Sequence, residues 1–175
     1  MTDIMLDLET LGVDSNSVVI SISAIEFNRN TGAIGREFEI GLDDNEQVAN
    51  GGIIDQSTVD WWAQQDVIAQ LEIARLPKLD VKDALLGYSE WVQKSSALTV
   101  WGNGATFDNV ILENLFKRHS INYPTKFWNN RCVRTLCDLT DIDTQNYDFK
   151  GVKHRGIDDC KHQINYCLDG IYKLR

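Results

Sequence analysis

Asp7 and Glu9 stand out near the start of the chain because they interrupt an apolar run, DIMLDLETLG over residues 3–12. In a strand, residues i and i+2 project from the same face, so these two carboxylates would lie side by side and repel each other. No Lys or Arg occurs between Ile4 and Thr10. Compensation must therefore come from elsewhere, as a cationic side chain, a raised pKa or a bound cation. An edge strand with a solvated acidic face is the alternative interpretation.

Acidic residues recur at two further places, each where a helix is expected to begin. Asp108 follows the turn GNGATF and precedes Leu112 by four residues, so it shares the inward face of its helix. In the segment KHRGIDDCKHQ, His154 lies in a Gly-flanked loop, and Asp158 and Asp159 fall in the first turn of the last helix. Any one such acid commonly caps a helix or complements its dipole. Their combination with the acidic pair on the first strand is more informative.

Hydrophobic periodicity predicts the strands that position these residues. Segments rich in β-branched and alternating apolar residues predict a meander of three strands over 3–12, 17–27 and 36–42. A short apolar strand over 97–101 ends at the Gly-rich turn before Asp108.

Helical spacing predicts most of the remaining elements. Helices are expected over 57–72, from Asp80, from Asp108 and over 157–174. In the first of these, Ser57 and Asp60 have the spacing of an N-cap and an acidic third position. The segment CVRTLCDLT, residues 132–140, is interpreted as a short apolar strand. This order of elements predicts an α/β fold in which helices flank a mixed central sheet.

Length and composition predict a single domain over residues 1–175, with 43% hydrophobic and 25% charged residues. No stretch approaches the roughly 20 apolar residues that span a bilayer, and no signal segment is evident, so we expect a cytoplasmic protein without membrane contact. The spacing and apolar surroundings of the cysteines predict free buried thiols. They are Cys132, Cys137, Cys160 and Cys167.

The net charge of −9 argues against a protein that holds duplex nucleic acid by neutralising phosphates. It does not exclude an enzyme that acts on nucleic acid, because acids that recruit metals make an active site negative. In such an enzyme, local Lys and Arg residues would matter more than the net charge.

Three stretches of the chain resemble the motifs of the DEDD superfamily of 3′–5′ exonucleases, in its histidine subtype, which has the ribonuclease H-like fold. They are DLETLG at 7–12, NGATFD at 103–108 and HRGIDD at 154–159, and they occur in the order of that family. The stretches GGIIDQSTVDWWAQQ and WGNGATFDNVILENL further resemble a branch that holds phage and prophage exodeoxyribonucleases, similar to exodeoxyribonuclease VIII, and some bacterial exoribonucleases.

Two positions depart from the pattern of the wider family. Asn103 stands five residues before Asp108 where four is commoner, which leaves its substrate-binding role open. Gly156 replaces the usual Ala, and we expect this change only to loosen the loop.

The resemblance implies a metal-dependent hydrolytic centre. Four carboxylates would hold two divalent cations about 3.5–4 Å apart, and oxygen ligands favour Mg²⁺ or Mn²⁺ over zinc. Those carboxylates are Asp7, Glu9, Asp108 and Asp159, with Asp158 as the alternative to Asp159. His154, with an ordinary pKa near 6.5, is the candidate general base that accepts a proton from the attacking water.

Other residues are candidates for contacts with the terminal nucleotide. By resemblance, Leu11 wedges against the terminal base, while Thr10 and Gly12 offer backbone contacts. Aromatic rings accept any base by stacking, so Trp61 and Phe107 are further candidates, with core packing as the alternative for Phe107. Trp62 is expected in the core. The full set of substrate-binding candidates is Thr10, Leu11, Gly12, Asn103, Phe107 and Trp61.

The leading hypothesis is a metal-dependent 3′–5′ exonuclease that releases nucleoside 5′-monophosphates from single-stranded DNA. The alternatives are an exoribonuclease, because no residue decides how a 2′-hydroxyl is treated, and a non-catalytic nucleic-acid-binding module. A homodimer through the exposed segment 119–131, with Phe127 and Trp128, is a further expectation. His119, as a cation at a helix end, and His162, among polar neighbours, are interpreted as structural.

Overall fold

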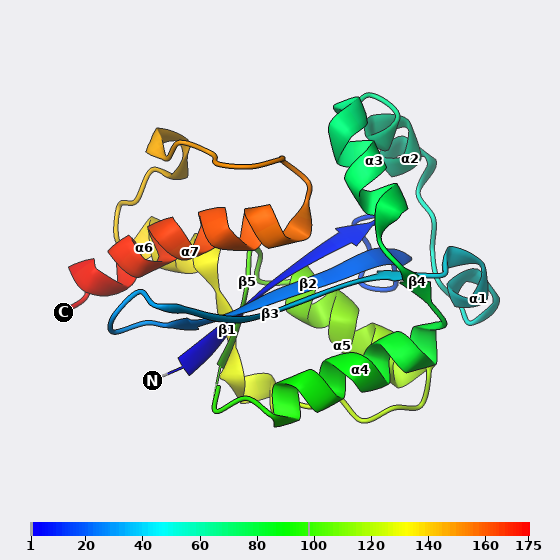
Figure 1. The fold of residues 1–175 in the computed structure, drawn as a ribbon, viewed down its shortest axis with the longest axis horizontal. Helices are drawn as coiled ribbons and strands as arrows, with labels where there is room; N and C mark the ends of the chain where they lie inside the picture. Colours follow the sequence, from blue (N-terminus) through cyan, green and yellow to red (C-terminus); the bar gives the residue numbers. More distant parts are fainter. Residues whose placement is uncertain (1, 98) are drawn as a thin grey trace.

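A mixed sheet of six strands forms the centre of the protein, in a computed structural model that describes residues 2–97 and 99–175. In the order β4-β3-β2-β1-β5-β6, the strands are Lys78–Leu79, Ile34–Leu42, Val19–Asn28, Thr2–Thr10, Thr99–Gly102 and Asn130–Cys132. The first three strands along the chain form the predicted antiparallel meander, and β5 and β6 continue it parallel to β1 (Figure 1). The predicted strand 97–101 corresponds to β5, and its Leu98 lies outside the described residues.

Helices cover both faces of this sheet. Their bounds are α1 Asp44–Ala49, α2 Gln56–Trp62, α3 Val67–Arg75, α4 Val81–Gln93, α5 Asp108–Arg118, α6 Val133–Leu139 and α7 Gly156–Lys173. Short 3₁₀ turns occur at Phe127–Asn129 and Thr144–Asn146. In Figure 1, α4 and α5 lie below the sheet, α6 and α7 lie above it, and α2 and α3 lie near the end toward which β1 points.

Alternation along β1 decides which core each residue joins. Ile4, Leu6 and Leu8 pack in the cluster with α4 and α5, whereas Met5 packs in the cluster with α6 and α7. The odd-numbered face of β1 therefore looks toward α7, and Asp7 belongs to that face.

The segment predicted as one helix over 57–72 is two helices. The chain leaves helical conformation after Trp62, and Asp66 begins α3 by accepting a hydrogen bond from the backbone N–H of Ile68 at 2.8 Å. The cap of α2 is also not Ser57, because Asp55 accepts the hydrogen bond from the Ser57 N–H at 2.9 Å. Caps at both starts satisfy N–H groups that the helices leave free, which makes the break stable.

The prediction of a strand over 132–140 was wrong. Only Cys132 belongs to a strand, β6, and the rest forms α6. Val133, Leu136 and Cys137 are buried against the cluster that includes α7, and this spacing of three and four residues suits one face of a helix. The apolar residues satisfied both patterns over so short a segment, and packing on α7 selected the helix.

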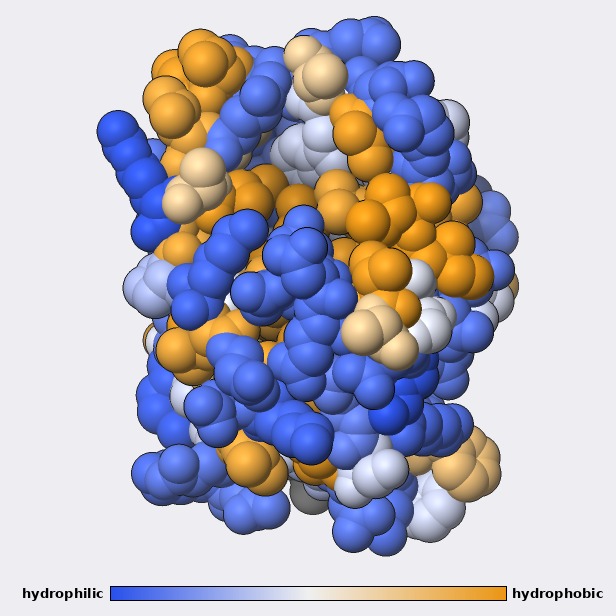
Figure 2. All heavy atoms as spheres, turned by 90° about the vertical axis from the view of Figure 1, so that its right-hand side faces the viewer, coloured by the Kyte–Doolittle hydropathy of each residue, from blue (hydrophilic) through white to orange (hydrophobic). Residues whose placement is uncertain are grey.

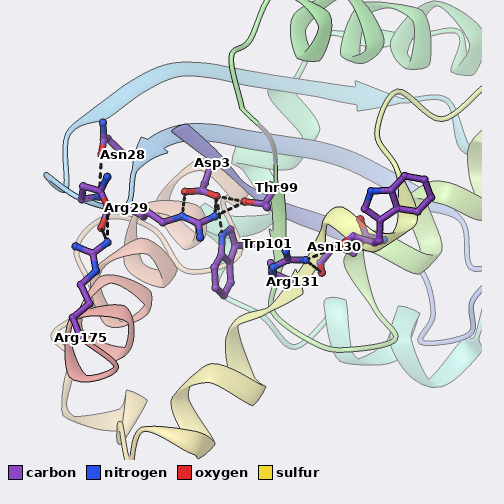
Figure 3. A network of polar contacts seen from close by, with 10 residues as sticks. Asp3, Asn28, Arg29, Thr99, Trp101, Asn130, Arg131 and Arg175 are labelled. Atoms are coloured by element: carbon purple, nitrogen blue, oxygen red, sulfur yellow. Dashed lines mark hydrogen bonds and ion pairs between the residues drawn. The ribbon is translucent and has the colours of Figure 1, made fainter. Parts of the chain in front are cut away.

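A buried ion pair joins the meander to β5 at the end of β1 where the chain begins. The Arg29 Nε donates to Asp3 Oδ2 at 2.6 Å, and Asp3 also accepts hydrogen bonds from Thr99 and, at 3.4 Å, from the Trp101 indole (Figure 3). The Arg29 guanidinium lies over the Trp101 ring at 5.8 Å. Asp3 is the only acid of β1 that precedes Asp7. The network that it forms lies toward the start of β1, away from Asp7 and Glu9.

The two histidines interpreted as structural are packed among other side chains, although not as predicted. His119 is buried and ends α5, and burial lowers its pKa, so it does not act as the expected cation. His162 packs against the rings of Phe149 and Tyr166, at 4.8 and 5.4 Å between centroids, and not among polar neighbours. All four cysteines are free thiols, and Cys132 alone is only partly buried.

Every helix in residues 2–97 and 99–175 is too short or too polar to cross a lipid bilayer. The cytoplasmic location stays a prediction from the sequence.

Candidate active site

Asp7, Glu9 and Asp159 come together on the face of the sheet that α7 covers. One carboxylate oxygen from each lies within 4.8 Å of the others. β1 supplies the first two side by side, and the first turn of α7 supplies the third. Alternation along β1 and the start of a helix on the same face are therefore sufficient to assemble this cluster.

Asp108 lies beside the cluster and is held by the backbone. Its Oδ1 accepts a hydrogen bond from the N–H of Leu8, the residue between the two strand acids, at 3.2 Å. Its Oδ2 accepts one from the N–H of Asn103 at 2.7 Å. Because only the turn 103–107 separates parallel strand β5 from α5, the first residue of α5 meets β1 at the carboxyl end of the strands. Asp108 is thus next to, but not part of, the three-carboxylate group.

The four acids are electrostatically unbalanced. Burial, followed by the charges of Asp108 and Asp159, raises the pKa of Asp7 well above its ordinary value, and burial and Asp7 do the same for Glu9. Burial also raises the pKa of Asp108 and of Asp159 to about 6. No ion pair within the described part of the chain joins a Lys or Arg to any of these carboxylates.

These residues fit divalent cations. The Asp159 Oδ2 is buried and has no hydrogen-bond partner, and Asp7 receives a single side-chain donor, the Gln163 amide at 2.7 Å. The group that could hold a metal consists of carboxylate oxygens alone, a hard donor set that suits Mg²⁺ or Mn²⁺. The sequence analysis missed Gln163, although its position four residues after Asp159 places both on one helix face.

The geometry distinguishes Asp159 from Asp158. The Asp158 Oδ2 accepts a hydrogen bond from the backbone N–H of Val152 at 2.9 Å and lies 3.8 Å from the Arg155 guanidinium. Asp158 therefore closes the preceding loop onto α7, while Asp159 turns toward β1. Of the two acids that the sequence left open, Asp159 is the one that joins the group with Asp7 and Glu9.

His154 lies in this loop with its ring against two tryptophans. The ring centroids are 4.9 Å from Trp61 and 5.8 Å from Trp62, both edge to face. The backbone of His154 is left-handed, with φ of 66°. Burial, and then the charge of Lys153, lower the pKa of the imidazole. The ring is therefore neutral near pH 7, as proton acceptance requires.

A cavity of about 410 Å³ opens beside the acidic cluster. Its lining residues are Leu8, Glu9, Thr10, Gly12, Val13, Ser57, Thr58, Trp61, Trp62 and Phe107. Trp61 is 42% exposed, whereas Trp62 is 9% exposed and donates its indole N–H to the Thr10 carbonyl at 2.9 Å. Trp62 is thus a core residue, as predicted. Phe107 packs against the core cluster, as one interpretation expected, and it also lines the cavity.

Two substrate-binding candidates, Leu11 and Asn103, do not line this cavity, unlike the candidates Thr10, Gly12, Phe107 and Trp61. Leu11 is not among the lining residues of the cavity, and its backbone N–H and carbonyl both make internal hydrogen bonds, at 2.8 Å to Val18 and to Asp55. Asn103 uses its N–H on Asp108, and its Oδ1 accepts a hydrogen bond from the Arg134 Nε at 3.4 Å.

Other lining residues were not found from the sequence. They are Val13, Ser57 and Thr58, of which Ser57 had been assigned to a helix cap. Ser57 and Thr58 line the cavity together with residues of β1 that lie more than 40 positions earlier in the chain. The local sequence carries no signal of that proximity.

Figure 2 views the side of the molecule near α2 and α3, where hydrophobic side chains gather among hydrophilic ones. Exposed apolar residues of this region include Ile53, Ile54, Val67, Ile68 and Leu71.

Gly156 does not loosen the loop, contrary to expectation. It is buried as the first residue of α7, and a Cβ added there would lie 2.3 Å from the Ser23 Oγ and 3.3 Å from Asp7 Oδ2. The missing side chain lets α7 approach β2 closely, which brings Asp159 to the strand acids.

Solved structures of other proteins have the same fold. The nuclease domain of 3'hExo, described as a DEDDh family member bound to rAMP, superimposes with a TM-score of 0.63 at 11% identity, covering 96% of this chain and 90% of that one. E. coli Exonuclease I in complex with a dT13 oligonucleotide gives a TM-score of 0.63 at 14% identity, with 99% of this chain and 40% of that one. The fold is the ribonuclease H-like fold of the DEDDh exonucleases, as predicted.

Sequence comparison gives the family. Residues 2–170 match the family described as the 3′–5′ exoribonuclease Rv2179c-like domain, and the chain belongs to it. The chain is also 26% identical over 200 residues to the exodeoxyribonuclease of Enterobacteria phage T4, across 94% of this chain and 86% of that protein. The protein is a 3′–5′ exonuclease that acts on nucleic acid.

Proposed function

We propose that the protein removes nucleoside 5′-monophosphates from the 3′ end of single-stranded DNA. Asp7, Glu9, Asp108 and Asp159 would hold two divalent cations, Mg²⁺ or Mn²⁺. The observation that carries this proposal is a group of three carboxylates within 4.8 Å of one another, beside a cavity and without an ion-pair partner among the described residues. When bound, the cations would neutralise the acids and stabilise the negative charge that develops on the phosphate oxygens.

The protein's own side chains would do the remaining work. The cavity would hold the terminal nucleotide, with the exposed face of Trp61 and the ring of Phe107 available for stacking on the base. His154, neutral near pH 7, would accept at a ring nitrogen the proton of the water that attacks the last phosphodiester. Gln163 would orient Asp7 through its amide. The products would be a nucleoside 5′-monophosphate and a strand that ends in a new 3′-hydroxyl.

DNA is the favoured substrate for two reasons. The phage relative that aligns with 94% of this chain is an exodeoxyribonuclease. The stretches around Trp61 and Asp108 resemble the exodeoxyribonuclease VIII-like branch, and we propose that the chain belongs there. RNA is the second candidate, because the family that matches residues 2–170 is described as exoribonucleolytic.

Digestion of matched 5′-labelled DNA and RNA strands with Mg²⁺ or Mn²⁺ tests the proposal. We expect a descending ladder, faster on DNA, that EDTA and Asp7→Asn both abolish. A faster ladder on RNA would transfer the proposal to the second candidate. Binding of either strand in EDTA without turnover in either metal would indicate a non-catalytic module and overturn it.

We also propose that the protein dimerises through the segment around Phe127 and Trp128. These two rings are 70% and 61% exposed, pack on each other at 4.9 Å, and precede the edge strand β6. Light scattering of the wild-type protein and of Trp128→Ser would test this. A monomeric wild-type protein would contradict it.

A further inference from the structure

Within the described residues, seven basic side chains of this acidic protein are held in ion pairs. Against 26 Asp and Glu residues there are 17 Lys and Arg residues. Those in ion pairs are Arg29, Arg36, Arg75, Lys94, Lys117, Arg155 and Lys161. A polyanionic strand that approaches these four carboxylates must be attracted by nearby cations that are not already held in ion pairs.

Arg134 is one of these free cations, at the start of α6. Its Nε donates to the Asn103 Oδ1 at 3.4 Å, and the Asn103 N–H in turn donates to Asp108 at 2.7 Å. Within residues 2–97 and 99–175, the terminal nitrogens of this guanidinium make no ion pair or hydrogen bond. Asn103 thus links the Arg134 side chain to Asp108 through two hydrogen bonds, which places the guanidinium beside the acidic cluster.

α6 is placed so that its first turn reaches the acids. β1, β5 and β6 run parallel; α6 begins directly after β6, and α5 begins after the turn 103–107 that follows β5. Residues in the first turns of both helices therefore meet at one edge of the sheet. Arg134 is the second residue of α6, as Asp108 is the first of α5.

Lys153 is a second free cation, on the side of the cluster formed by α7. It is exposed, directly precedes His154, and lines a groove of about 330 Å³ together with Gln65 and Asp66. The backbone of His154, the next residue, hydrogen-bonds to Asp159, which places Lys153 near that acid. The four acids are thus flanked by one cation from α6 and another from the loop before α7.

We propose that Arg134 and Lys153 bind phosphates of the substrate strand on the two flanks of the acidic cluster, and that Asn103 positions the Arg134 guanidinium. This inference rests on the proposed function. The free terminal nitrogens of Arg134 can donate two parallel hydrogen bonds to one phosphate, whereas Lys153 offers a point charge. It also gives Asn103 a role that does not require contact with the nucleotide.

Salt dependence of binding tests the proposal. A fluorescent single-stranded oligonucleotide is titrated with Asp7→Asn protein in Mg²⁺ by anisotropy at several salt concentrations. Arg134→Gln and Lys153→Gln are made in the same background. Each should weaken binding about tenfold and reduce the slope of log K against log salt by about 0.7, the value for one phosphate contact of a single strand. Arg134→Lys should restore the slope but only part of the affinity, because lysine returns the charge without the two parallel N–H donors of the guanidinium.

Lys82→Gln is the matched control. Lys82 is exposed on α4, which covers the opposite face of the sheet, and it should leave the affinity and the slope unchanged. If both Arg134→Gln and Lys153→Gln keep the salt slope of the Asp7→Asn parent protein, the proposal is overturned. An equal loss of affinity in Lys82→Gln would also overturn it, because it would indicate that the positive charge acts from anywhere on the protein surface. The same holds if the Asp7→Asn parent protein does not bind the strand.

Hydrolysis by the wild-type protein separates this inference from the proposed function. If wild-type protein shortens the strand while both glutamine variants bind as the parent does, only the inference fails. If wild-type protein cleaves neither DNA nor RNA, the proposed function fails, whatever the slopes show.

Discussion

Replacing Asp159 by Asn should stabilise the metal-free protein at neutral pH while abolishing hydrolysis. The Asp159 Oδ2 is buried without a hydrogen-bond partner, and the carboxylate is grouped with those of Asp7 and Glu9. An amide of similar size keeps one acceptor oxygen for the backbone of His154 and removes the charge. The same charge that the reaction needs is therefore a cost to the fold when no cation is bound.

The magnitude follows from the pKa of Asp159, which burial raises from 3.8 to about 6. Because the folded protein holds the proton more tightly than the unfolded chain, the penalty is absent below pH 3.8 and fully present above about pH 6. Each pKa unit is worth about 1.36 kcal/mol, which gives about 3 kcal/mol at pH 7 as an upper limit. Since the side chain keeps some contact with solvent, we expect a gain of about 2 kcal/mol at pH 7 and less than about 1 kcal/mol at pH 4.

Urea unfolding in EDTA at both pH values measures this gain as a shift of the midpoint at constant slope. Added Mg²⁺ should narrow the difference, because a ligand at 100 times its Kd stabilises the wild-type fold by about 2.7 kcal/mol. Asp158→Asn is the matched control, and it should lose stability because Asp158 accepts a hydrogen bond from Val152 and lies beside Arg155. An Asp159→Asn protein that is less stable than wild type in EDTA at pH 7, or equally shifted at both pH values, would refute the reasoning.

Three further predictions concern the surroundings of the site. Asp3→Asn should lower stability by about 3–5 kcal/mol, since it leaves Arg29 without its buried partner, and a thermal melt shifted by less than a few degrees would contradict this. Gly156→Ala should cost about 1–3 kcal/mol in urea unfolding, because its Cβ meets Ser23, and Ser23→Gly in the same chain should recover most of the loss if that contact is the cause. Trp61→Ala should expose the His154 ring, and because burial lowers the pKa of this imidazole, the acidic limb of the kcat–pH profile should move toward pH 6.5. Trp61→Phe is the control and should leave the limb in place. An unmoved limb in Trp61→Ala would argue against His154 as the base.

Much of the fold could be predicted because its signals are local. Alternation in residues 3–12 and 17–27 determined the meander, and spacing of three and four residues determined the last helix within one residue at each end. Where a local signal suited two structures, the prediction failed. Residues 132–140 are apolar enough for a strand or a helix face, and only packing on α7 made them helical. The break after Trp62 depended on Asp66, whose capping role the continuous periodicity concealed.

The sequence by itself determined that Asp7 and Glu9 share a face, because the twofold period of a strand is carried by neighbouring residues. It also placed Asp108 and Asp159 at helix starts. Only the tertiary structure decided that these acids meet, since their convergence depends on the parallel pairing of β1 with β5 and on α7 covering the odd-numbered face of β1. The choice of Asp159 over Asp158 and the close approach at Gly156 were decided there too. The contact of Gly156 with Ser23 and the grouping of Asp159 with Asp7 and Glu9 join segments more than 100 residues apart in the chain, which no local period encodes.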